Sequence, residues 1–139
     1  MESVDGELIP FEFLKALFLL APLTGDPLDI AADKHQVPRP LVHAVAQVES
    51  GKKCAAKNGK YQGIMQVSPG AAREVGVRYP FKTCDDEIEA GVRYLALAIA
   101  KGGPTCHGVS LYQSGLNKRP HCSSYGRKVM SISKQKGNE

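Results

Sequence analysis

Helix start and stop signals divide this chain into short segments, and they limit its fold more than any other feature of the sequence. Asp26-Pro27 supplies an N-cap followed by a proline in the first turn, which predicts a helix as far as Lys34. Pro40 begins a second predicted helix, and Gly51 ends it because glycine readily adopts the left-handed conformation found at helix C-termini. The pattern is typical of a chain built mostly from short helices.

The same kinds of signal continue through the rest of the chain, with one interruption. Ser68-Pro69 and Thr83 resemble caps at helix starts, and glycines follow the predicted ends. Four more helices are therefore predicted, over residues 69–76, 83–102, 107–114 and 123–132. The interruption is Asn58-Gly59, a turn signal that predicts a small hairpin within residues 56–67. The sequence thus predicts an α+β fold that is predominantly α-helical, with one small β-hairpin.

The length of 139 residues suits one domain with a modest core. No repeat or linker divides the chain, so we expect a single domain over 1–139, with a core over 26–132 and a flexible tail over 133–139. Residues 1–25 are expected to form an N-terminal helical extension. Their apolar run, Phe11–Leu23, follows acidic rather than basic residues and is too short to span a membrane. An export signal is not evident, and stable membrane insertion is not expected.

The formal net charge of +4 is mild, and the positive residues are spread along the chain. No basic stripe carries interleaved aromatic side chains, so nucleic acid is not expected as a partner. Neither a phosphate-binding glycine loop nor an H-E-x-x-H or G-x-S-x-G motif is present. The four histidines, at 35, 43, 107 and 121, are scattered, and His43 is interpreted as structural. The sequence therefore indicates no cofactor and no metal.

Four cysteines, an even number, suit two disulfides in an exported protein. A zinc site is not expected, because no C-x-x-C pair occurs. We favour the pairs Cys54–Cys84 and Cys106–Cys122, since each would join a loop to a neighbouring element. Four reduced thiols are the alternative, and spacing alone does not decide between the two.

Glu49 stands at the end of the helix predicted from Pro40, just before Gly51. The partial negative charge of a helix C-terminus and the apolar neighbours on this helix both disfavour a carboxylate, so both should raise its pKa. A carboxylic acid that keeps its proton near neutral pH can protonate a glycosidic oxygen. The alternative is a solvated glutamate at a helix end, which periodicity alone favours.

Gln66 and three tyrosines are further candidates for contacts with a sugar. Gln66 lies in Gly63–Ser68, and if that segment is extended its amide points away from the neighbouring apolar side chains. Tyr94, Tyr112 and Tyr125 fall on three successive predicted helices, and a phenol suits both stacking on a sugar and a hydroxyl contact. The alternatives are a plain strand and ordinary core tyrosines.

Five short segments, in order along the chain, resemble the catalytic domain of soluble lytic transglycosylases, glycoside hydrolase family 23, which is related to goose-type lysozyme. They are AVAQVESG (44–51), GIMQ (63–66), AGVRYL (90–95), LYQSG (111–115) and SYGRKV (124–129). The resemblance covers Asp29 to Val129, which is most of the chain.

This resemblance implies a lysozyme-like fold with the hairpin beside a catalytic cleft. It implies cleavage of the β-1,4 bond between N-acetylmuramic acid and N-acetylglucosamine in peptidoglycan, with Glu49 acting first as acid and then as base to give 1,6-anhydro-muramoyl products. The residues it places in the cleft are Ser50, Gln66, Ser68, Tyr94, Tyr112, Gln113 and Tyr125. Tyr112 is expected to lie closest to Glu49. The implied setting is periplasmic or secreted, as a monomer, with a cell-envelope assembly as a further partner.

Three departures from the family pattern bear on the reaction. Gln113 stands where the family often has Asn, and Glu89 falls near the usual Asn of the long helix. Ser68 stands where goose-type lysozymes place an Asp that helps to direct water, which favours a transglycosylase over a hydrolase. An approach of Asp85 or Asp86 to the cleft keeps a muramidase open as the alternative. A non-catalytic wall-binding module of a secretion or phage apparatus is the other.

Overall fold

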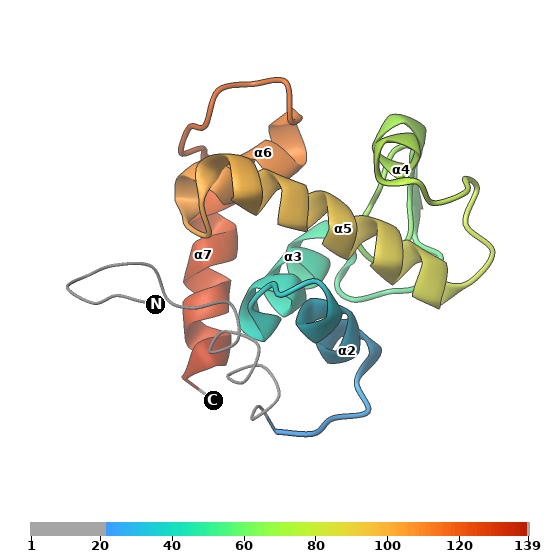
Figure 1. Cartoon of the computed structure of the whole chain (residues 1–139), viewed down its shortest axis with the longest axis horizontal. Helices are drawn as coiled ribbons and strands as arrows, with labels where there is room; N and C mark the ends of the chain where they lie inside the picture. The colour runs from blue at the N-terminus through green and yellow to red at the C-terminus, as the bar shows by residue number, and fades with distance from the viewer. Residues whose placement is uncertain (1–21, 139) are drawn as a thin grey trace, which may run out of the picture.

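The computed structural model describes residues 22–138, which form six helices and one two-stranded sheet (Figure 1). The elements in chain order are α2 (Pro27–Lys34), α3 (Arg39–Ser50), β1 (Lys57–Asn58), β2 (Tyr61–Gln62), α4 (Pro69–Val75), α5 (Cys84–Gly102), α6 (Cys106–Ser114) and α7 (Ser124–Gly137). This is the predicted α+β, predominantly helical and lysozyme-like fold. The predicted N-terminal extension lies outside the described residues as far as residue 21.

The predicted caps form. The side chains of Asp26, Ser68 and Thr83 each accept a hydrogen bond from a backbone N–H in the first turn of the helix that follows. Gly51 and Gly76 end α3 and α4 in the left-handed conformation. Local signals therefore determine where these helices begin and end.

Two helices organise the core. α3 packs against α2 and α7, while α5 packs against α2, α4 and α6, and α6 in turn contacts α7 (Figure 1). The largest fully buried side chains include Leu41 of α3, Leu95 of α5 and Met65 from the segment after β2. The C-terminal end of α3 is thereby fixed between α7 and that segment. No helix within residues 22–138 is both long and apolar enough to cross a membrane.

The hairpin forms as predicted, with Lys57 opposite Gln62 and Asn58 opposite Tyr61. The segment after it is a turn rather than the extended strand considered from the sequence. Gly63 (φ 95°) and Gln66 (φ 50°) both adopt positive φ, and the chain folds back so that Val67 pairs with Gln62. The alternation expected at Gln66 is therefore wrong.

The last helix is longer than predicted. α7 extends to Gly137, so residues 133–137, which were assigned to a tail, are helical. Ile132 packs against the core, and Lys134 and Lys136 lie in the last turn, where positive charge favours the negative end of the helix dipole. Favourable charge at the helix end therefore accounts for the extra turn beyond residue 132.

Both predicted disulfides are present, Cys54–Cys84 and Cys106–Cys122, with Cα–Cα distances of 5.4 and 5.0 Å. The first joins the loop after α3 to the start of α5. The second joins the start of α6 to the segment before α7. Each links a loop to a helix terminus, as the sequence suggested.

Replacing Cys106 and Cys122 together by serine should lower the free energy of unfolding by about 3 kcal/mol. The bridge spans 16 residues, and a cross-link of that length removes about this much loop-closure entropy from the unfolded chain. Urea denaturation of the oxidised wild type and of the double variant measures the difference. An unchanged free energy of unfolding would contradict a stabilising role for this bridge.

Candidate active site

Glu49 lies in the last turn of α3, and the packing of α3 on α7 brings it beside Tyr125. The Tyr125 hydroxyl donates a hydrogen bond of 2.8 Å to Glu49 Oε2. Burial raises the pKa of the Glu49 carboxyl above its ordinary value, and the hydrogen bond from Tyr125 offsets part of that rise. The direction agrees with the sequence prediction, and such a carboxyl group is suited to carry a proton.

Tyr125 is held as a donor to this carboxyl group. Burial raises the pKa of its phenol, and the negative charge of Glu49 raises it further, so the hydroxyl keeps its proton. The sequence predicted that Tyr112 would lie closest to Glu49. In the structure Tyr125 makes the hydrogen bond to Glu49, while the Tyr112 hydroxyl donates to the carbonyl oxygen of Met65.

Tyr112 and Tyr94 form one wall of the site. The buried Tyr112 hydroxyl donates to the carbonyl oxygen of Met65 at 2.7 Å. Its ring packs edge to face against Tyr94, with centroids 5.6 Å apart, and the Tyr94 hydroxyl accepts from the Leu116 N–H at 3.3 Å. Burial, and after it the charge of Glu49, raises the pKa of Tyr112, which shows that this wall lies near Glu49.

Ser50 ties the end of α3 to the turn after the hairpin. Its hydroxyl donates to the carbonyl oxygen of Ile64 at 2.7 Å and accepts from the Lys53 N–H at 2.9 Å. The side chain of Gln66 closes the same turn, since its amide nitrogen donates to the carbonyl oxygens of Gly63 and Ala56. Ser50, the neighbour of Glu49 in sequence, therefore holds the turn that Gln66 closes.

A pocket of about 180 Å³ opens beside the turn. Five residues predicted from the sequence are among those that line it: Gln66, Ser68, Tyr94, Tyr112 and Gln113. Tyr61 of the hairpin, which the sequence reading did not single out, also lines it. Glu49, Ser50 and Tyr125 are not part of its lining. The predicted residues thus fall into two adjoining groups, with Tyr112 lining the pocket and lying near Glu49.

Ser68 caps a helix, and the acidic pair Asp85 and Asp86 lies at the start of another. The Ser68 side chain accepts from the Ala71 N–H at 3.1 Å and so caps α4. Asp85 and Asp86 lie in the first turn of α5, where negative charge favours the positive end of the helix dipole. Capping accounts for Ser68, and the helix dipole accounts for Asp85 and Asp86.

The sequence reading missed Glu87. It is buried, with 3% of its surface exposed, and accepts backbone hydrogen bonds from Ala55 and Ile64. The residue expected near the usual Asn of the long helix was Glu89, but Glu89 contacts His35 and Arg93 instead. The family pattern for this helix is written N-x-x-x-G-x-x-Y-L, and with Gly91 as its glycine the Asn position falls at residue 87. That spacing was the available signal.

The close approach of Met65 to α5 explains why this helix carries a glycine at position 91. A Cβ atom at this position would lie 2.5 Å from Sδ of Met65, far inside contact distance. The close approach lets Met65 fill the core while its carbonyl oxygen accepts from Tyr112. The glycine of the AGVRYL segment therefore sets the depth at which the turn is buried.

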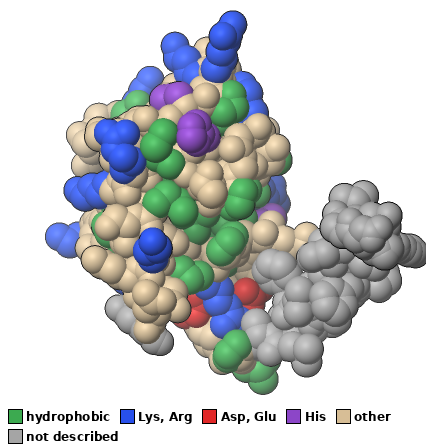
Figure 2. Space-filling view, turned by 90° about the vertical axis from the view of Figure 1, so that its left-hand side faces the viewer, with side chains coloured by type: hydrophobic (Ala, Val, Ile, Leu, Met, Phe, Trp, Pro, Cys, Tyr) green, Lys and Arg blue, Asp and Glu red, His purple; other side chains and the backbone are tan. Residues whose placement is uncertain are grey.

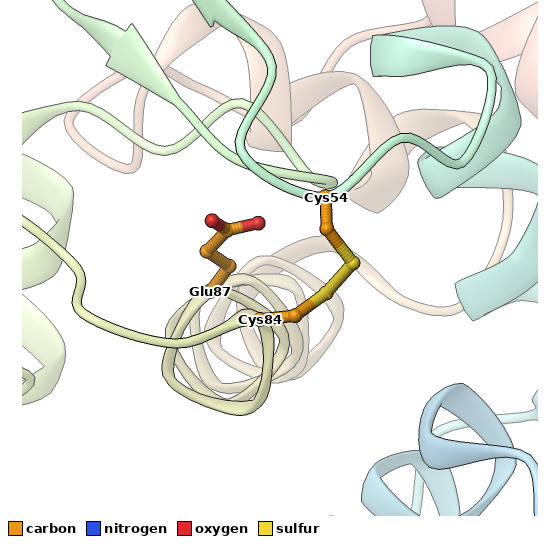
Figure 3. A group of neighbouring side chains, drawn as sticks. All are labelled: Cys54, Cys84 and Glu87. Atoms are coloured by element: carbon orange, nitrogen blue, oxygen red, sulfur yellow. A yellow bond between two sulfur atoms is a disulfide. The ribbon is translucent and has the colours of Figure 1, made fainter.

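Within residues 22–138, two groups of side chains have the spacing of metal ligands. One consists of Cys54, Cys84 and Glu87 (Figure 3), and the sulfur atoms of its two cysteines form a disulfide. The other is Asp26, Asp29 and His43, in which Asp29 and His43 bond each other at 2.7 Å. Because these atoms are engaged in a covalent bond or in hydrogen bonds, both groups are accounted for as structural.

The chain matches the family model of the transglycosylase SLT domain over residues 26–128. The match covers well over half of the sequence, so this protein belongs to the transglycosylase SLT domain family. Membership indicates an enzyme that acts on peptidoglycan as a lytic transglycosylase, in line with the five segments recognised in the sequence. A comparison with solved structures finds no match.

Replacing Tyr125 by phenylalanine should raise the pKa of Glu49 further. The Tyr125 hydrogen bond stabilises the carboxylate form, and without it burial acts unopposed. The pKa can be followed by NMR titration of the protein labelled with ¹³C at glutamate carboxyl groups. Tyr94→Phe is the matched control, because the Tyr94 hydroxyl binds Leu116 and not Glu49. An unchanged or lowered pKa in Tyr125→Phe would refute this description of the pair.

Proposed function

We propose that this protein cleaves the β-1,4 bond between N-acetylmuramic acid and N-acetylglucosamine in peptidoglycan and releases 1,6-anhydro-muramoyl products. The observation that carries the proposal is the environment of the Glu49 carboxyl group. Its carboxyl group has a raised pKa, receives a hydrogen bond from Tyr125 and lies beside a wall of tyrosines, in a domain of the matching family. An acid that can give up and regain one proton is what this reaction needs.

In the first step the protonated Glu49 gives its proton to the glycosidic oxygen. The bond between that oxygen and C1 of the muramoyl sugar breaks, and the N-acetylglucosamine portion leaves as an alcohol. The Tyr125 hydrogen bond stabilises the carboxylate that forms, since the donor is already in place. The electron-deficient C1 is stabilised by the substrate's own N-acetyl group.

In the second step the Glu49 carboxylate takes the proton from the C6 hydroxyl of the same sugar. The C6 oxygen attacks C1 and closes the 1,6-anhydro ring, and Glu49 returns to its acid form. One carboxyl group thus serves both steps, and no water is consumed. Ser68 stands at the position where goose-type lysozymes carry an Asp, and its hydroxyl supplies no carboxylate to direct water, which supports the transglycosylase over the muramidase alternative.

We further propose that the pocket residues bind the glycan strand. Tyr61, Tyr94 and Tyr112 offer aromatic surface, while Gln66, Ser68 and Gln113 offer polar groups. Ser50 and Tyr125 lie on the Glu49 side of the site. Ser50 donates to the Ile64 carbonyl oxygen, and Tyr125 donates to the Glu49 carboxyl group. Sugar recognition by aromatic and amide side chains supports this assignment.

Charge and disulfides support an extracytoplasmic setting. Between Ala90 and Asn138 the sequence holds no Asp or Glu, and Figure 2 shows Lys and Arg side chains spread over the α7 side of the molecule. Such a surface attracts an anionic polymer at long range. Two disulfides suit an oxidising compartment. We propose a periplasmic or secreted monomer, able to serve a cell-envelope assembly.

Replacing Glu49 by glutamine should reduce cleavage of purified peptidoglycan by roughly 10³-fold, because the variant lacks the group that gives and takes the proton. Released muropeptides are quantified by mass spectrometry, and the wild type should yield anhydro products. Wild-type rates from Glu49→Gln would remove Glu49 from the mechanism. An inactive wild type would instead favour a non-catalytic wall-binding module.

The same variant should be at least as stable as the wild type at pH 7. The pKa of Glu49 is raised in the folded state, so the folded protein binds more protons than the unfolded one between the two pKa values. Stability contributed by this group is present at low pH and is lost as pH rises through that window. Urea denaturation from pH 4 to 8 should show the advantage of Glu49→Gln growing with pH. A variant less stable than wild type at pH 7 would contradict the raised pKa.

A further inference from the structure

Glu87 places a carboxylate inside the protein, directed at the backbone of the hairpin segment. Its side chain extends from α5 toward the strands, beside the Cys54–Cys84 disulfide (Figure 3). Both of its oxygens lie 3.1 Å from the Ala55 nitrogen, and Oε1 lies 2.9 Å from the Ile64 nitrogen. Hydrogen bonds from backbone N–H groups to a carboxylate are stronger than neutral ones.

The two donors stand at the two ends of the hairpin. Ala55 precedes β1, and Ile64 follows β2. One carboxylate therefore closes the base of the hairpin and attaches it to α5. The neighbouring disulfide attaches the same stretch of chain through Cys54, so the hairpin base has a covalent and a polar anchor on one helix.

Gly63 makes room for this carboxylate. A Cβ atom at Gly63 would lie 2.6 to 2.7 Å from Cγ, Cδ and Oε1 of Glu87. The backbone of Gly63 also has a φ of 95°, which side chains other than glycine rarely adopt. Only glycine at position 63 therefore allows both the backbone turn and the close approach of the Glu87 carboxylate.

Two hydrogen bonds connect the turn that Glu87 holds to the site: one to Ser50, beside Glu49, and one to Tyr112 of the pocket wall. The N–H group of Ile64 donates a hydrogen bond to Glu87, and the carbonyl oxygen of Ile64 accepts one from the Ser50 hydroxyl. Ser50 directly follows Glu49 in the chain. The next carbonyl group, that of Met65, accepts the Tyr112 hydroxyl. The position of the turn relative to Glu49 and to the pocket wall therefore depends on where Ile64 is held.

We propose that Glu87 is a positioning residue of the reaction: its carboxylate fixes the base of the hairpin and so sets the turn at residues 63–66 against Glu49 and the pocket. This inference rests on the proposed function. Glutamine is the sharpest substitution, because it removes the charge and keeps the shape. Both oxygens of Glu87 contact the Ala55 nitrogen, so in either orientation the NH₂ group of glutamine would face the Ala55 N–H and could accept nothing there. Glu89→Gln is the matched control, made on the same helix but on a residue that binds His35 and Arg93.

The experiment measures kcat and KM on purified peptidoglycan per folded molecule, with the folded fraction taken from denaturation curves. Amide hydrogen exchange at Ala55 and Ile64 is followed by NMR. Glu87→Gln should lose on the order of 100-fold in kcat/KM, as a small misplacement of substrate-contacting groups does, and both amides should exchange faster. The pH midpoint set by Glu49 should stay unchanged, and Glu89→Gln should match the wild type in all of these.

Wild-type kcat/KM per folded molecule in Glu87→Gln, or unchanged exchange at both amides, would overturn the proposal. If that variant does not fold, Glu87→Asp takes its place, since its carboxylate is one methylene shorter and lies further from both donors. Slower turnover with faster exchange then supports the proposal, and wild-type values of both overturn it. A wild type that yields no anhydro products would defeat the proposed function, while the exchange data would still report on the anchor.

Discussion

The contact between the end of α3 and the start of α7 is what the candidate site depends on. It joins Glu49 to Tyr125, two residues that lie 76 positions apart in sequence, and it sets the balance of forces on the carboxyl group. Burial favours the protonated form, and the hydrogen bond favours the carboxylate. A group under both influences can change its protonation state twice in a reaction, which is why a single carboxyl group can serve as acid and as base.

Around this contact, backbone atoms do much of the positioning. Ser50 and Tyr112 do not bind each other, yet both bind carbonyl groups of the same turn, at Ile64 and Met65. The turn reaches that place because Gly91 lets Met65 pack against α5 and because Gly63 leaves space for Glu87. Several residues of the family segments thus bind the backbone of this turn, and the pocket lies beside it.

Much of the fold could be predicted from the sequence because helix signals are local. Asp26, Ser68 and Thr83 act on N–H groups two or three residues away, so their caps could be read directly. The site was predictable mainly through the family motifs. What escaped prediction depends on contacts between distant segments: the positive φ of Gln66, the partner of Tyr125 and the burial of Glu87. Periodicity describes one element at a time and contains no information on which element packs against it.

The central claim is that Glu49 works without a second carboxylate and without water. Digestion of purified peptidoglycan in H₂¹⁸O tests it most directly, because hydrolysis places an oxygen from water at C1 of the muramoyl product whereas ring closure uses the sugar's own C6 oxygen. The account predicts anhydro-muramoyl products that contain no ¹⁸O. Reducing products labelled with ¹⁸O at C1 would contradict it and would make the protein a hydrolase.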